Sequence, residues 1–243
     1  MNTRHIALAA LATGLLTAWS AAGIAQGPPT PDQLVAGLKQ NLAESQKRLR
    51  QYEWIETIAI SLKGEEKSRK QQRVYYGADG KLTKLPVGSA PAQAKAPAPS
   101  GGRGGKLKER VVENKKEDMQ EYMQQAVALI HKYVPPDPAL IQTAKDGGKL
   151  QVRPPQNGKV RAEFRDFVQK SDLMAIDVDA KALLLAGLNV ATYLEKPEDT
   201  VTLDVRYSTL ADGTAFVART TFEAKAKNIT VVVENSGHRP ISK

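Results

Sequence analysis

Residues near the C-terminal end alternate between apolar and polar side chains, and this pattern constrains the fold most strongly. Between residues 201 and 208 the odd positions carry Val, Leu, Val and Tyr, while the even positions carry Thr, Asp, Arg and Ser. Successive side chains of a β-strand point to opposite faces of the sheet. The alternation therefore predicts a strand with one buried face and one face in water. Residues 52–63 (YEWIETIAISLK) follow the same period.

Short turn sequences separate the predicted strands. Asn157-Gly158 lies between "KLQVR" and "KVRAEFRDF", and Asp212-Gly213 follows the strand at residues 201–208. Both dipeptides favour tight hairpin turns. Consecutive strands joined by such turns predict an antiparallel sheet, which can keep one face in water.

Three segments have the spacing of amphipathic helices. The first begins at Thr30-Pro31 and runs to about Arg50, and the second begins at the capping pair Asn114 and Glu117 and ends at Pro135-Pro136. The third is short, beginning at Asp137-Pro138 and ending at Gly147-Gly148. Side-chain caps at the start and Gly or Pro at the end are typical helix boundaries.

The order of these elements predicts an α+β fold. We expect one large curved antiparallel sheet, a half-barrel, with two or three helices covering its concave face. Residues 26–243 are expected to form a single domain. This domain contains an Ala/Pro/Gly-rich insert at residues 86–105, whose composition is typical of a disordered spacer.

Residues 1–25 have the pattern of a cleaved signal peptide. A short polar head with Arg4 is followed by the apolar run Ile6–Leu16 and by small residues, and cleavage is expected after Ala25. The chain contains no cysteine, so disulfides and cysteine–metal sites are excluded. These features predict a periplasmic location.

The positive charge of the chain is concentrated in one part of it. The formal net charge is +9. Residues 63–116, here called the basic segment, contain 14 Lys or Arg and 5 Asp or Glu. Such a segment can bind an anionic membrane surface or an acidic envelope protein, or it can simply be a solvated surface.

The sequence offers little material for catalysis. Beyond the signal peptide the histidines are His131 and His238, and no Gly-x-Ser-x-Gly or His-Glu-x-x-His pattern occurs. Asp177 and Asp179 lie on one face of a predicted strand, as a metal or acid–base pair would, but two acids at the solvent-facing end of a strand are the favoured interpretation. We therefore expect a protein that is not an enzyme, with no cofactor, no metal site and no nucleic-acid partner.

Glu56 breaks the apolar face of its predicted strand. Alternation places it beside Trp54 and Ile58, where an ionised carboxylate is costly unless it is paired. It could reach an arginine, face a wet cavity or lie near a sheet edge.

A curved sheet with an apolar concave face can enclose a ligand, or the same side chains can fill a core. If the face is hollow, the predicted lining residues are those of the strands with the clearest apolar faces: Trp54, Ile58, Ile60, Leu203, Val205, Phe216 and Phe222. The helix above them would act as a lid through an adaptable apolar stripe: Met119, Tyr122, Met123 and Ile130.

The arrangement resembles the bacterial periplasmic lipoprotein carriers of the LolA/LolB type. The hairpins of "ATYLEKPEDTVTLDVRYSTLADGTAFVARTTFEAKAKNITVVVENSGHRPI" and the opening helix leading into "YEWIETIAISLKG" carry the resemblance. It implies a soluble periplasmic binding protein that holds a lipid or a lipoprotein acyl chain. The alternative is a non-enzymatic envelope interaction or structural module that docks through the basic segment.

Overall fold

The computed structural model describes residues 31–88 and 105–241. The predicted signal peptide and most of the predicted insert lie outside these residues. The helical elements are α1 (Pro31–Leu49), α2 (Gly105–Ile130), α3 (Pro138–Asp146) and the short 3₁₀ helix η2 (Lys225–Lys227). The strands are β1 (Tyr52–Leu62), β2 (Glu65–Tyr76), β3 (Leu82–Pro86), β4 (Leu150–Gln156), β5 (Lys159–Arg165), β6 (Leu173–Asp179), β7 (Leu184–Tyr193), β8 (Thr200–Thr209), β9 (Ala215–Ala224) and β10 (Ile229–Pro240).

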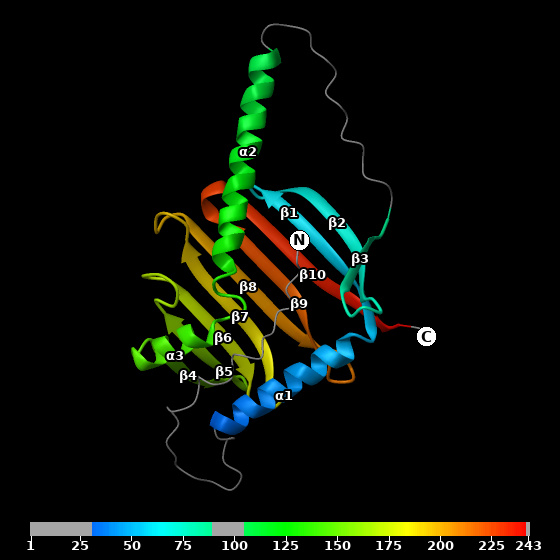
Figure 1. Cartoon of the computed structure of the whole chain (residues 1–243), viewed down its shortest axis with the longest axis vertical. Helices are drawn as coiled ribbons and strands as arrows, with labels where there is room; N and C mark the ends of the chain where they lie inside the picture. Colours follow the sequence, from blue (N-terminus) through cyan, green and yellow to red (C-terminus); the bar gives the residue numbers. More distant parts are fainter. Residues whose placement is uncertain (1–30, 89–104, 242–243) are drawn as a thin grey trace.

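The ten strands form one sheet in the order β3-β2-β1-β10-β9-β8-β7-β6-β5-β4 (Figure 1). Every neighbouring pair is antiparallel. The chain builds β1–β3 outward to one edge, crosses through α2 and α3 to the other edge, and returns strand by strand until β10 pairs with β1. The prediction of an α+β fold with a large antiparallel sheet is thus confirmed.

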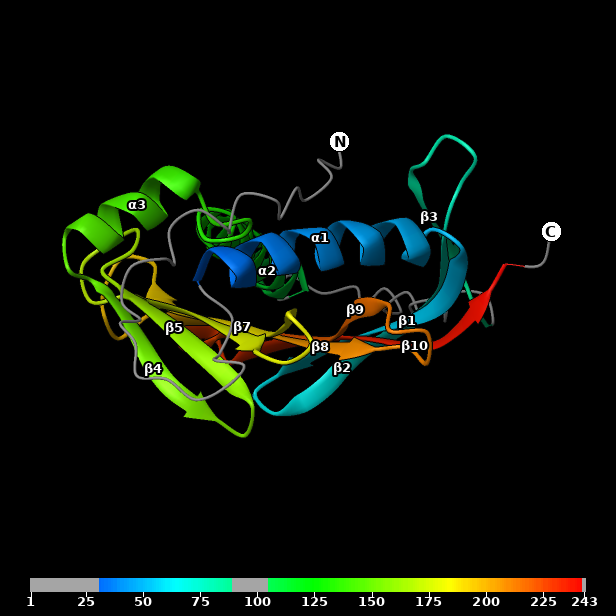
Figure 2. The same cartoon turned by 90° about the horizontal axis from the view of Figure 1, so that it is seen from below.

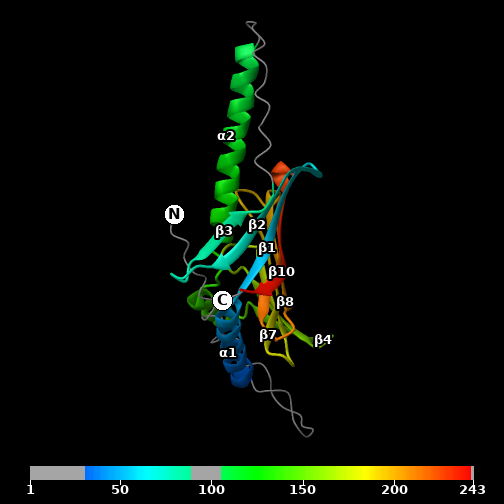
Figure 3. The same ribbon diagram turned by 90° about the vertical axis from the view of Figure 1, so that its right-hand side faces the viewer.

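The helices lie on one side of the sheet, as Figures 2 and 3 show. We call this side the inner face and the opposite side the outer face. α1 packs against β7 and β9, and α3 packs against β5. Gly37 allows the close approach of α1, since a Cβ at this position would collide with the side chain of Leu183. The apolar residues of the alternating strands point to this inner face, while their polar neighbours form the outer face.

The hairpin turn predicted at Asn157-Gly158 is present. Asn157 and Gly158 adopt positive φ values of 52° and 75° between β4 and β5. Lys63 and Gly64 do the same between β1 and β2, with φ values of 54° and 80°. Two successive positive φ values match the twist of the flanking strands, which keeps the hairpins tight.

The predicted start of the second helix is wrong. α2 begins at Gly105, nine residues before the capping pair at Asn114. The intervening residues 106–113 (KLKERVVE) contain no Gly or Pro and consist mainly of helix-forming residues. Helix propensity therefore outweighs the capping signal. The predicted insert is correspondingly shorter at both ends, because Pro86 belongs to β3 and Gly105 to α2.

The last strand, β10, is longer than its apolar alternation. That alternation consists of Ile229, Val231 and Val233. β10 nevertheless continues to Pro240, which pairs with Tyr52. Gly237 has a φ of 63° beside an irregularity in the β1–β10 register between Glu53 and Ile55. The pairing of β10 with β1 thus continues on both sides of this irregularity.

Substitution of Met174 by alanine should destabilise the protein strongly. Met174 is fully buried on β6 against the helices, and loss of its side chain leaves a cavity that costs about 2–5 kcal/mol. The exposed Val127 on α2 provides the control, since Val127→Ala should change the free energy of unfolding by about 0.5 kcal/mol or less. Urea unfolding followed by circular dichroism measures both, and equal effects would contradict the assignment of the core.

Candidate functional site

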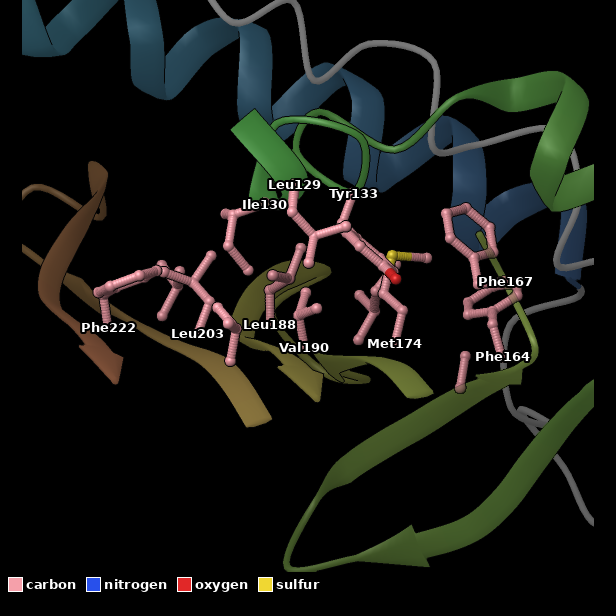
Figure 4. Close-up of a cluster of buried hydrophobic side chains, with 14 of the residues drawn as sticks. Leu129, Ile130, Tyr133, Phe164, Phe167, Met174, Leu188, Val190, Leu203 and Phe222 are labelled. Atoms are coloured by element: carbon pink, nitrogen blue, oxygen red, sulfur yellow. The ribbon is translucent and has the colours of Figure 1, made fainter. Parts of the chain in front are cut away.

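The inner face is filled where the helices cover it. Leu129 and Ile130 at the end of α2, with Tyr133 just beyond it, pack onto side chains of β5–β9 (Figure 4). Three of the predicted lining residues lie in this core, each only 8% exposed: Leu203, Val205 and Phe222. In this half of the inner face, the side chains pack against one another.

The inner face is more open where β1, β2 and β10 pair. Ile58 lies in register with Val233, and Ile60 with Val231. These four residues, here called the inner apolar strip, point to the inner face, and Ile60 is 38% exposed. Most of β1 and β2 lies to one side of the helices in Figure 1. The strip therefore continues the apolar core onto accessible surface, and it includes the predicted lining residues Ile58 and Ile60.

The two remaining predicted lining residues belong to an aromatic cluster at one end of the strip. The rings of Trp54 and His238 stack, with their centroids 5.5 Å apart. The ring of Phe216 also contacts His238, at 4.1 Å between centroids. Trp54 Nε1 donates a hydrogen bond to Asn235 Oδ1 at 3.0 Å. Partial burial lowers the pKa of His238. Trp54 is therefore held in place by its neighbours at the end of the strip.

Glu56 pairs with a lysine from the edge strand. Lys84 Nζ donates to both carboxylate oxygens of Glu56, at 2.7 and 2.9 Å. The Glu56 side chain is 10% exposed, whereas that of Lys84 is 41% exposed. The carboxylate is therefore paired, but with a lysine rather than the expected arginine, and β1 is the third strand from the edge of the sheet. β3 thus supplies the charge that makes this buried carboxylate tolerable.

The predicted lid residues lie on the second half of α2. Ile130 is buried in the core, and Met119, Tyr122 and Met123 are partly buried against it. Tyr122 Oη donates to Asp199 Oδ1 at 2.5 Å, and Lys227 Nζ lies 5.4 Å from the ring centroid. Burial and this hydrogen bond raise the pKa of Tyr122. These contacts tie α2 to the β7–β8 loop and to η2.

A buried hydrogen-bond network anchors the chain just after α2, and sequence patterns did not reveal it. Tyr133 Oη donates to Asp172 Oδ2 at 2.6 Å and also lies 2.7 Å from Thr192 Oγ1. The Asp172 carboxylate accepts three further bonds from backbone N–H groups of the preceding loop: Phe167, Val168 and Gln169. Tyr133 and Asp172 are 39 positions apart and belong to different elements. No spacing rule links two residues so far apart in the chain.

The outer face carries a network of polar side chains across neighbouring strands. Arg161 pairs with Asp177 at 2.8 Å and donates to Asn189 Oδ1 at 3.0 Å. Asp179 instead accepts hydrogen bonds from the backbone N–H groups of Lys181 and Ala182 in the turn after β6. The two aspartates therefore have separate structural partners. Within residues 31–88 and 105–241, no group of three or more His, Asp or Glu side chains is arranged to hold a metal ion.

The outer face also contains a shallow depression of about 190 Å³ on β1, β2, β9 and β10. Its two arginines are both paired, Arg69 with Glu66 and Arg219 with Glu234. Thr57 and Ser61 contribute hydroxyl groups. Because its charges are balanced by its own side chains, the depression has no net attraction for an ion.

Much of the charge of the basic segment is neutralised where the structure describes its side chains. Between residues 63 and 88 there are seven Lys or Arg. Five of them form ion pairs with carboxylates: Lys67, Arg69, Arg73, Lys81 and Lys84. In this part of the segment, Lys63 and Lys70 form no such pair with a described residue. The strands of the basic segment are therefore less positive than its composition indicates.

Replacing Tyr133 by phenylalanine should destabilise the fold by about 1–3 kcal/mol, because the buried Asp172 carboxylate loses a donor that water cannot replace. Tyr122→Phe, on α2 itself, is the control. It should cost about 1 kcal/mol or less, since Asp199 lies near solvent. Urea unfolding at neutral pH measures both variants, and a larger loss for Tyr122→Phe would show that the network at Asp172 is not the main anchor.

The stability of the protein should fall on acidification through His238. Burial holds the folded-state pKa of His238 below the unfolded value of about 6.5, so the unfolded chain binds more protons as the pH falls. The contribution is complete above about pH 6.5 and is lost as the pH falls toward the folded-state pKa. His238→Phe keeps a ring against Trp54 and Phe216 and should remove this part of the pH dependence. Urea unfolding at a series of pH values tests it, and identical profiles for both proteins would refute it.

No helix within residues 31–88 and 105–241 is long and apolar enough to cross a membrane. No protein-family model matches the chain, and no curated protein matches it.

Two solved structures align with most of the chain. A DUF1329 family protein from Desulfovibrio piger aligns over 85% of this chain and 92% of its own, with 12% sequence identity and a TM-score of 0.37. A LolA superfamily protein from Nitrosomonas europaea aligns over 84% and 94%, with 10% identity and a TM-score of 0.34. The structural neighbours of this chain thus include a member of the superfamily that its strand pattern resembles.

Proposed function

We propose that this protein is a periplasmic binding protein that shelters an acyl chain of a lipid or lipoprotein on the inner apolar strip. The observation that carries the proposal is the exposure of Ile60 within a continuous apolar surface formed by β1 and β10. On the far side of α2 and α1 the same face is a filled core. Among the described strand residues, Ile60 is the large apolar side chain that is exposed on the inner face.

The strip and the apolar residues of α2 border the same core, and both suit an elongated apolar ligand. Met119 and Met123 of α2 pack at the border of the core, and their unbranched side chains adapt to ligands of different shape. Burial of acyl surface supplies about 0.8 kcal/mol per CH₂ group when it is complete. A chain lying between the strip and α2 gains part of this free energy. The function needs no catalytic group.

The alternative function, docking through the basic segment, has less support. Five of its described cations already have carboxylate partners. A docking surface for an anionic membrane or an acidic protein would draw on unpaired charge.

Ile60→Asp should weaken binding of an uncharged acyl ligand by about tenfold or more, because the introduced carboxylate would lose its hydration when the acyl chain of the ligand covers it. Leu85→Asp is the matched control: Leu85 is 39% exposed on β3 and lies in register with Arg73, on the outer face. Monolauroylglycerol displacing the neutral dye Nile red from delipidated protein provides the measurement.

Three outcomes are distinct. Loss of binding in Ile60→Asp with retention in Leu85→Asp supports the strip as the site. Equal loss in both variants, or no binding by the parent protein, overturns the proposal. If Ile60→Asp instead converts a dimer into a monomer in analytical ultracentrifugation, the strip is a contact between two copies of the chain.

A further inference from the structure

The inner apolar strip has a lysine at one end. Lys70 on β2 lies directly in register with Ile58 on β1, and Ile58 lies in register with Val233 on β10. The row continues through Thr220 on β9 to Val205 on β8, at the border of the core. From β2 to β9 this row spans about 14 Å at the usual strand spacing. It therefore has a cation at one end and packed apolar side chains at the other.

The exposed side chain of Lys70 can contact both water and a ligand bound on the strip. Its side chain is exposed, and within the described part of the chain it forms no ion pair. β3 ends at Pro86, which pairs with Gln72, and Val87 N–H donates to the carbonyl oxygen of Gln71; within residues 31–88 and 105–241, no further strand pairs with β2 beside Lys70 on this side. The neighbouring inner-face positions on β2 carry the uncharged Ser68 and Gln72.

The nearby acid does not cancel this charge. Glu56 lies two residues before Ile58 on the inner face, but Lys84 binds both of its carboxylate oxygens. The Glu56–Lys84 pair is neutral as a unit, so Lys70 remains the uncompensated charge beside the strip. A ligand that complements this row has an apolar chain and a negative headgroup.

We propose that the ligand of the strip is an anionic amphiphile, with its headgroup at Lys70 and its acyl chain directed across Ile58 and Val233 toward the core. This inference rests on the proposed function and adds the ligand's charge and orientation. Lys70 contributes selectivity rather than most of the affinity, since one exposed ion pair contributes about 0.2–1 kcal/mol. Added salt should weaken this selectivity.

The test compares two ligands that have the same acyl chain and different headgroups. Laurate carries a carboxylate, whereas monolauroylglycerol is uncharged. The binding of each is measured as displacement of Nile red from the delipidated full-length protein. We expect the parent protein to prefer laurate by about twofold to fivefold at low salt. Lys70→Gln should abolish this preference and leave monolauroylglycerol binding unchanged. Lys70→Glu should reverse it.

Lys159→Gln is the matched control, because Lys159 is exposed on β5 and lies next to Val160, on the same face as Arg161. It should keep the preference for laurate. If both ligands bind equally to the parent protein, or if Lys159→Gln has the same effect as Lys70→Gln, the inference is overturned while the proposed function stands. If neither ligand binds, the proposed function itself fails.

Discussion

The pairing of the first strand with the last is the constraint on which the rest of the structure depends. β1 and β10 are in register from Tyr52 and Pro240 to Leu62 and Ile229. This pairing joins the N-terminal strands to the C-terminal series and makes one sheet of ten strands. It also brings Ile58 beside Val233 and Ile60 beside Val231, so the proposed binding surface exists only because the two ends of the chain meet. Such pairing forms at a high cost in loop-closure entropy, and the long register supplies the compensating hydrogen bonds.

The crossover between the two edges of the sheet divides the inner face into a filled half and an open half. α2 and α3 connect β3 to β4, and the Tyr133–Asp172 hydrogen bond fixes the end of α2 over β5–β9. A buried carboxylate with four donors tolerates little movement, because each lost bond costs its full desolvation. The helices are therefore held on one half. The same anchoring leaves the inner apolar strip accessible.

Alternation and turn residues were sufficient to predict most of the fold. The period of two at residues 201–208 and the Asn157-Gly158 turn both correspond to observed elements, because these signals act between neighbours in the chain. Prediction failed where two local signals compete. The capping pair at Asn114 was weaker than the helix propensity of residues 106–113.

The sequence by itself determined which side chains share a face, since the alternation of a strand follows directly from its backbone geometry. It thereby placed Ile58 and Ile60 together with Leu203 and Phe222 on one apolar face. Only the tertiary structure decided which of these are core and which are surface, because that depends on where the helices cross the sheet. It also decided that Lys84 neutralises Glu56 and that Lys70 lies at the end of the apolar row. The register of β1 with β2, including its irregularity between Ile60 and Ser61, and the register of β2 with β3 set both.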